Sequence, residues 1–148
     1  MLANPPQNMP RITPNLFYDD PAAALEWLSA AFGFETKMSM PGPDGGIFHA
    51  EMQVEDSVIM LSPTSATEQW RSPVSLAGSV TQGLYVYVGD VGAHCERAQA
   101  SGATIVSKPE EMFWGDRTYV VEDLEGHRWT FAQPVREVAP GDLKPSGS

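Results

Sequence analysis

The feature of this 148-residue chain that most limits its fold is an internal repeat. Residues 16–34 and 86–103 align at an offset of 70 positions, with one gap near their ends. The alignment brings like residues together in four pairs: Asp20 with Asp90, Ala23 with Ala93, Glu26 with Glu96, and Gly33 with Gly102. Each copy reads as an apolar strand, an Asp suited to cap a helix, a helical stretch and a Gly suited to end it. A duplicated unit of this kind predicts two similar modules.

Three strand-like segments follow each predicted helix, separated by turn sequences such as GPDGG (42–46) and DLEG (123–126). The segments are residues 35–40, 47–54 and 57–63 in the first half, and residues 103–108, 116–123 and 127–134 in the second. Each half is therefore predicted as a βαβββ module. The predicted organisation is a domain over 11–135 with modules 11–63 and 82–134, a linker at 64–81, and tails at 1–10 and 136–148.

The charge balance excludes whole classes of partner. The chain has 9 Lys+Arg against 19 Asp+Glu, a formal net charge of −10, and its basic residues are scattered along the sequence. Binding to nucleic acid or to an anionic membrane surface needs a basic cluster, so neither partner is expected. The N-terminus lacks the pattern of a signal peptide and no apolar run is long enough to span a membrane, which predicts a cytoplasmic protein. The single cysteine, Cys95, excludes an internal disulfide.

Four stretches within residues 11–134 carry a resemblance to a known family. They read ITPNLFYDDPAAALEWLSAAFGFE, HAEMQVEDSVIMLSP, GLYVYVGDVGAHCERAQASGA and FWGDRTYVVEDLEGHRWTFAQP. In this order they resemble the vicinal oxygen chelate superfamily, which contains glyoxalases, bleomycin resistance proteins and extradiol dioxygenases. The D-x-x-G-H-x-W turn at 123–129 is especially similar to its PhnB-like branch.

The resemblance implies an α+β fold in which two βαβββ modules form curved mixed sheets around a cavity, and it implies a homodimer. It also implies a divalent metal held by His, Gln or Glu on the first and last strands of each module. The corresponding positions of this sequence hold Thr13, Met60, Gly83 and Thr130, which are poor ligands for Mn, Fe or Zn. The sequence therefore predicts no metal site and no cofactor, with a small organic molecule as the partner.

Strand alternation predicts which side chains line the cavity. The predicted ligand-binding residues are Asn15, Phe17, His49, Met60, Tyr85, Tyr87, Trp114 and Arg117. Together they make an aromatic, weakly polar pocket with one cation, a composition suited to flat organic ligands. Phe17 and Met60 fit the core equally well, and Arg117 either grips a ligand carboxylate or pairs with Asp116.

His49 and Glu51 lie two positions apart on one predicted strand and therefore share a face. They are the candidate catalytic residues, as an acid/base pair or as two metal ligands, although a plain polar strand face also explains them. His94 is expected to pack or to face solvent, and His127 to bond the local backbone. Cys95 reads as a small hydrophobic residue and not as a nucleophile.

Three functional hypotheses follow from these residues. The first is a metal-free small-molecule-binding protein of the glyoxalase/bleomycin-resistance type, which holds an aromatic or amphipathic ligand for sequestration or resistance. The second is a glyoxalase-like lyase or isomerase that uses His49 and Glu51, with or without a divalent metal. The third is an interaction module whose cavity is filled by its own side chains.

Overall fold

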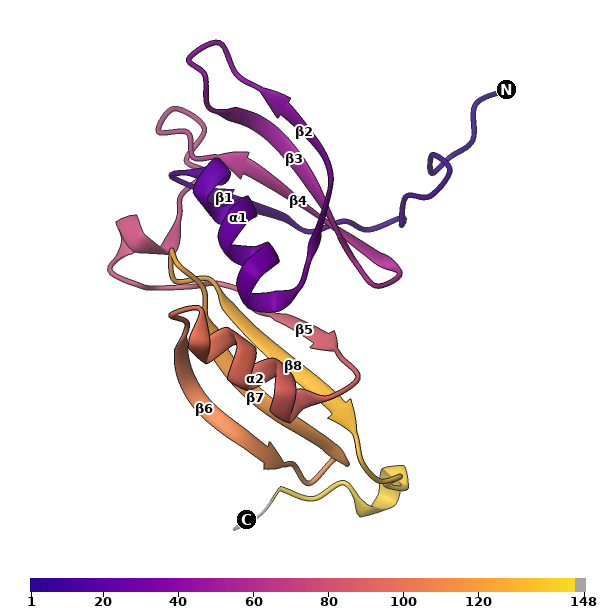
Figure 1. The fold of residues 1–148 in the computed structure, drawn as a ribbon. Coiled ribbons are helices and arrows are strands. Elements are labelled where there is room, and N and C mark those ends of the chain that lie inside the picture. Colours follow the sequence, from indigo (N-terminus) through magenta and orange to yellow (C-terminus); the bar gives the residue numbers. More distant parts are fainter. Residues whose placement is uncertain (146–148) are drawn as a thin grey trace.

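The computed structural model describes residues 1–145, so the last three residues of the predicted C-terminal tail lie outside the described part. The first module contains β1 (Asn15–Tyr18), α1 (Pro21–Phe32), β2 (Glu35–Pro41), β3 (Ile47–Val54) and β4 (Ser57–Pro63). The second contains β5 (Leu84–Tyr87), α2 (Val91–Ala100), β6 (Thr104–Glu111), β7 (Asp116–Glu122) and β8 (Arg128–Pro134). Figure 1 shows them as two similar units placed one after the other. The predicted pair of βαβββ modules is confirmed.

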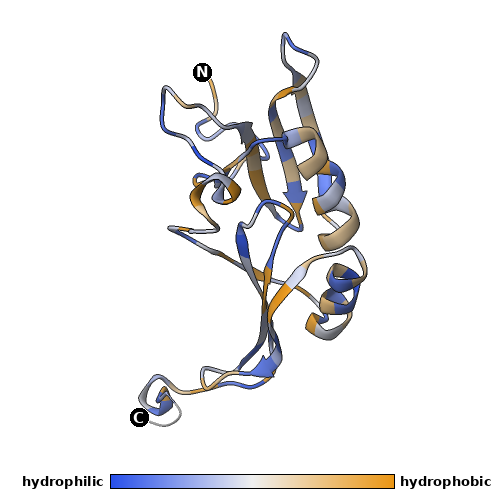
Figure 2. Ribbon diagram, turned by 90° about the vertical axis from the view of Figure 1, so that its left-hand side faces the viewer, coloured by the Kyte–Doolittle hydropathy of each residue, from blue (hydrophilic) through white to orange (hydrophobic). Residues whose placement is uncertain are grey.

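Each module forms one four-stranded mixed sheet, in the order β1-β4-β3-β2 and β5-β8-β7-β6. β1 runs parallel to its neighbour β4, and β5 runs parallel to β8. All other neighbouring strands are antiparallel. Neither sheet closes on itself. Both helices lie on one side of the sheets, as the turned view in Figure 2 shows, which leaves the other face of each sheet without a helix. The predicted α+β class is confirmed.

The helices begin and end where the repeat predicts. The Asp20 carboxylate accepts a hydrogen bond from the Ala23 amide at 3.1 Å, and Asp90 caps α2 through Ala93 at 3.0 Å. Gly33 ends α1 in the left-handed region at φ 77°, which costs glycine little. Within residues 1–145, neither helix combines the length and the apolar character that a membrane-spanning helix needs.

β6 differs from the sequence prediction, which ends it at residue 108. The strand continues to Glu111, and its pairing with β7 shifts register between Ser107 and Glu110. Pro109 lies at this irregularity, and proline in a strand is tolerated there because it has no amide hydrogen to donate. The strand therefore passes the residue that would be expected to stop it.

The buried aromatic core is shared between the modules. Phe32 from α1 lies with its ring centroid 4.8 Å from that of Phe131 and 5.6 Å from that of Trp129, both on β8. Cys95 on α2 is buried in the same cluster, as its expected role as a small hydrophobic residue requires. The two sheets therefore pack as parts of one hydrophobic core.

Hydrogen bonds also join the C-terminal ends of the two helices. The Arg97 guanidinium on α2 donates to the carbonyls of Ala30 at 2.9 Å and Ser29 at 3.2 Å, in the last turn of α1. In the other direction, the Trp27 indole on α1 donates to the Ser101 carbonyl at 3.1 Å. Both helix ends carry partial negative charge, so the Arg97 cation stabilises their approach.

The D-x-x-G-H-x-W turn binds the end of β1 in the other module. The buried Asp123 carboxylate accepts from the Tyr18 hydroxyl at 2.6 Å, and burial raises the pKa of this carboxyl. Glu125 accepts from the Asp19 amide at 2.7 Å, and the ring of His127 contacts the Phe17 carbonyl at 2.8 Å. The amide of His127 bonds locally, as expected, whereas its ring bonds 110 positions away.

The predicted linker has structure of its own. Ser65 and Trp70 pair their backbones at 2.9 and 3.0 Å, and a short 3-10 helix, η1 (Pro73–Leu76), follows. Ser72 between them is fully buried and donates to Glu125 at 2.6 Å. A second 3-10 turn, η2 (Pro140–Asp142), lies in the predicted C-terminal tail.

Candidate functional site

Strand alternation turns one set of side chains away from the helices. On β1, Leu16 and Tyr18 are buried in the core, whereas Asn15 and Phe17 face the uncovered side. The same alternation on β5 exposes Tyr85 and Tyr87, with 45% and 56% of their surface accessible. Rings this exposed are not core residues, which makes each uncovered face a candidate site.

The first uncovered face holds a pocket of about 470 Å³, here called the first-module pocket. Phe17 forms one wall, and Trp70 from the linker stacks on it with centroids 4.5 Å apart and planes 5° apart. The Ser62 hydroxyl donates to the Asn15 amide oxygen at 2.9 Å and lies 3.5 Å from Nδ1 of His49. The pocket therefore combines a rigid aromatic wall with a polar floor.

The candidate catalytic pair lies on this same face. Nε2 of His49 is 3.8 Å from a carboxylate oxygen of Glu51, and Nζ of Lys37 is 3.9 Å from the other oxygen. These are ion-pair distances, longer than the hydrogen bond through which a base is usually activated. Met60 lies opposite Glu51 in the sheet register and is half-buried. The sequence prediction that His49 and Glu51 share a face is confirmed.

The second uncovered face carries the tyrosine cluster, made of Tyr85, Tyr87, Trp114 and Asp116. The hydroxyls of Tyr85 and Tyr87 both donate to Oδ2 of Asp116, at 2.6 and 3.0 Å. The Trp114 indole in turn donates to the Tyr85 hydroxyl at 3.0 Å. Burial and the Asp116 hydrogen bond raise the pKa of Tyr85 to about 12, and the same hydrogen bond raises the pKa of Tyr87. Both tyrosines therefore keep their protons at neutral pH.

Arg117 lies apart from this cluster. It alternates with Asp116 along β7 and shares the face of Tyr119, whose ring is fully buried in the core. Within residues 1–145, its carboxylate neighbour Asp116 makes no ion pair with it. The structure thus brings Tyr85, Tyr87 and Trp114 together as predicted, but it does not bring Arg117 to them.

Sequence reasoning missed two residues of these faces as site residues. Asp116 gave only a partial signal, because it falls on the phase opposite to Tyr119 and Val121 but shares its own phase with another apolar residue, Val120. Trp70 gave no such signal, since it lies in a segment without periodicity and reaches Phe17 only through the pairing of Ser65 with Trp70.

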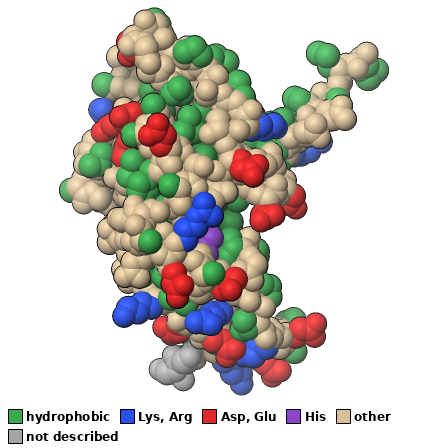
Figure 3. Space-filling model, viewed as in Figure 1, with side chains coloured by type: hydrophobic (Ala, Val, Ile, Leu, Met, Phe, Trp, Pro, Cys, Tyr) green, Lys and Arg blue, Asp and Glu red, His purple; other side chains and the backbone are tan. Residues whose placement is uncertain are grey.

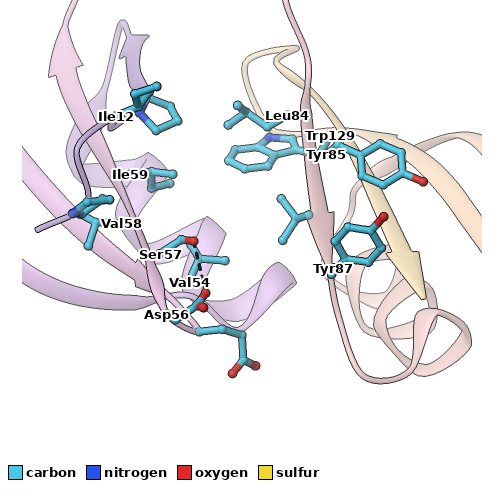
Figure 4. A pocket seen from close by; sticks show the side chains of 14 residues that line it. Ile12, Val54, Asp56, Ser57, Val58, Ile59, Leu84, Tyr85, Tyr87 and Trp129 are labelled. Carbon is cyan, nitrogen blue, oxygen red and sulfur yellow. Dashed lines mark hydrogen bonds between the residues drawn. The ribbon is translucent and has the colours of Figure 1, made fainter. Parts of the chain in front are cut away.

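A crevice of about 300 Å³ separates the two modules along β5. Figure 4 shows Ile12 and Ile59 on the first module facing Leu84 and Trp129 on the second, with the rings of Tyr85 and Tyr87 beyond β5. The crevice is mainly apolar, and Asp56 lies at its edge. Apart from Arg117, the predicted ligand residues lie on two separate faces and do not form a single cavity between the modules.

A third pocket, of about 330 Å³, lies between the modules on the helix side, where Figure 3 shows a hollow. His94 lines it, with Nδ1 bonded to the Tyr119 hydroxyl and its ring packed 4.0 Å from that of Phe131. Burial lowers the pKa of His94 to about 4. His94 therefore packs, which is one of its two expected roles.

The protein is therefore an α+β protein made of two βαβββ modules, with both helices on one side of the sheets. The family model of the Glyoxalase/Bleomycin resistance protein/Dioxygenase superfamily matches residues 9–131, and the chain belongs to this superfamily. The resemblance seen in the sequence is confirmed at this level.

Several relatives are uncharacterized or known by structure. An uncharacterized protein of Mycobacterium bovis is 36% identical over 138 residues, covering 91% of this chain and 90% of its own length. The crystal structure of TioX from Micromonospora sp. ML1 is 34% identical with a TM-score of 0.69, over 84% of this chain and 98% of TioX. TnmS3, an antibiotic binding protein from Streptomyces sp. CB03234, shares the fold at 20% identity, with a TM-score of 0.60 over 83% of this chain and 95% of TnmS3.

The metal implied by the superfamily does not fit the donors of this chain. At the four corresponding positions the chain has two threonines, a methionine and a glycine. Within residues 1–145, no three His, Cys, Asp or Glu side chains come close enough together to hold a metal ion. His49 and Glu51 supply two donors, fewer than the three protein ligands typical of a catalytic zinc site.

Proposed function

We propose that this protein binds an aromatic or amphipathic organic molecule without a metal, for sequestration or resistance. The observation that carries the proposal is the pair of rigid aromatic surfaces on the two uncovered sheet faces. Phe17 on β1 stacks with Trp70 from the linker on one face, and Tyr85 and Tyr87 on β5 expose their surfaces on the other. Aromatic side chains held in this way stack on flat ligands. The antibiotic-binding function of TnmS3, which shares the fold, supports the same class of ligand.

We further propose a homodimer in which each ligand site combines two faces. The first-module pocket and the tyrosine cluster lie on different sheets of one chain. A second copy that brings its tyrosine cluster over the first-module pocket would place all the predicted residues except Arg117 around one cavity. Phe48, Trp70 and Tyr87, with 58%, 48% and 56% of their surface exposed, are the apolar area that such a contact would cover. We also propose that the protein is cytoplasmic and that it belongs to the PhnB-like branch.

Three measurements on the purified protein test the binding function. A thermal-shift screen with aromatic metabolites is expected to give stabilisation that grows with ligand concentration. The shift should be unchanged by EDTA, and metal analysis should find less than one Zn, Mn, Ni or Fe per chain. Light scattering should give the mass of a dimer. Stoichiometric metal in the protein, or loss of binding in EDTA, would overturn the metal-free reading.

The second candidate function is a lyase or isomerase that uses His49 and Glu51, favoured by the 3.8 Å approach of these side chains beside a pocket. It predicts that His49→Ala abolishes turnover while ligand affinity remains. The absence of turnover on thiol-hemiacetal and enolisable substrates, with and without added metal, would exclude it.

A further inference from the structure

We infer that the tyrosine cluster selects ligands by hydrogen-bond polarity: it accepts hydrogen bonds and donates none. The favoured ligand class is therefore an aromatic ring that carries a hydroxyl or amino donor, and ligands that present only acceptors are disfavoured. This inference rests on the proposed binding function and specifies the ligand class of the same site.

Every hydrogen that the side chains of the tyrosine cluster can donate is used within the cluster. A phenol hydroxyl has one hydrogen to donate and two lone pairs to accept with. The single hydrogens of Tyr85 and Tyr87 are both directed at Oδ2 of Asp116. The one N–H of the Trp114 indole is directed at the Tyr85 hydroxyl. All three donors of the cluster are thus used internally, while the lone pairs of Tyr87 have no partner within residues 1–145.

Asp116 sets this direction from a buried position on β7. Only 7% of its surface is exposed, and its backbone carbonyl accepts from the Met112 amide at 2.7 Å across the β6–β7 turn. An ionised carboxylate only accepts hydrogen bonds, so two hydroxyls that converge on it must both donate. The raised pKa values of both tyrosines agree with hydroxyls that hold their protons against this carboxylate.

The accessible group of the cluster is the Tyr87 hydroxyl. Tyr87 has 56% of its surface exposed, compared with 45% for Tyr85, whose hydroxyl oxygen already accepts from the Trp114 indole. A ligand donor placed against this oxygen forms a hydrogen bond at no cost to the cluster. A ligand acceptor placed there either stays unpaired or draws the Tyr87 hydroxyl hydrogen away from Asp116, which then keeps only its hydrogen bond from Tyr85.

The experiment compares two probes with the same ring system, 2-naphthol and 2-methoxynaphthalene, by isothermal titration calorimetry. Only the naphthol has a donor, and the added methyl group should favour the ether on hydrophobic grounds. We expect the native protein to bind 2-naphthol about tenfold more tightly. In Tyr87→Phe, which keeps the ring, the preference should fall to about onefold to twofold because the accepting oxygen is gone.

Asp116→Asn tests the cause of the polarity. Its amide can donate to one tyrosine, which releases that hydroxyl proton toward the ligand, so the preference for naphthol should also collapse. Glu96→Gln is the matched control, since it removes one carboxylate charge from an exposed position on α2. It should keep the native preference.

The outcomes separate the inference from the proposed function. If both probes bind the native protein equally, or if the preference survives in Tyr87→Phe and Asp116→Asn, the inference is overturned and the binding function stands. If neither probe nor any other aromatic compound binds, the proposed function fails, and the inference fails with it.

Discussion

His94 shows how a single residue in this core responds to pH. Its pKa is lowered to about 4, mainly by burial, against an ordinary value of 6.5. Between these values the unfolded chain binds a proton at this residue and the folded chain does not. The contribution of His94 to stability is therefore fully present above pH 6.5 and is lost as the pH falls toward 4.

We predict that His94→Gln weakens the acid sensitivity of the fold. Gln can still accept from the Tyr119 hydroxyl but does not titrate. Urea unfolding at intervals from pH 7 to pH 4 should show a smaller loss of unfolding free energy for the variant than for the native protein. Parallel pH profiles for the two proteins would contradict the assignment of a lowered pKa to His94.

At the scale of elements, the β2–β3 turn and the β6–β7 turn occupy the same place in the two modules but pack differently. Gly45 and Gly115 both have positive φ, at 85° and 100°. A Cβ at Gly45 would meet nothing within 4 Å, whereas a Cβ at Gly115 would lie 2.3 Å from the Arg136 carbonyl oxygen. The β6–β7 turn is thus packed under the chain that follows β8.

We predict that Gly115→Ala destabilises the protein by more than about 2 kcal/mol, because a positive φ and a backbone clash add. Gly45→Ala, the matched control, should cost only about 1 kcal/mol for its φ alone. Denaturant unfolding of both variants checks this difference. Equal losses would mean that the chain around Arg136 moves away without cost.

The elements were more predictable from the sequence than the site. Capping by Asp20 and Asp90 and the period of the apolar residues fix the helices locally, so both were found. The side of the sheet on which Arg117 lies depends on which residues of β7 point into the core. The burial of Tyr119 among residues distant in the sequence decides this. Trp70 reaches Phe17 through a linker fold that no local pattern indicates.

For the whole molecule, the turn at 123–127 bonds to the first module and the linker, so we predict that the two modules unfold as one unit. Glu125 accepts hydrogen bonds from the Asp19 and Asp20 amides and from Ser72, which lie on the first module and the linker. Glu125 is only 9% exposed. A donor that lost its hydrogen bond to this carboxylate would therefore stay unpaired and away from water. Together with Arg97, which bonds across the C-terminal ends of the two helices, Glu125 links the two modules.

Glu125→Gln is predicted to lower the unfolding free energy by about 1–3 kcal/mol, since its amide group faces a donor. Glu122→Gln is the control, because its ion pair with Arg128 is exposed and worth at most about 1 kcal/mol. Fluorescence and circular dichroism should give coincident unfolding curves for the native protein. Two separate transitions in the native protein would show that the modules are independent.

The stack of Trp70 on Phe17 ties the length of the connecting segment to the shape of a pocket. Insertions in a surface connection normally cost little free energy, since closure entropy grows slowly with length. Here a residue added or removed between Pro63 and Trp70 would move one wall of the first-module pocket while both sheets keep their register. Chains with this architecture can therefore diversify by changes in spacing as well as by substitution, and the inter-module segment is the place to engineer a new pocket shape.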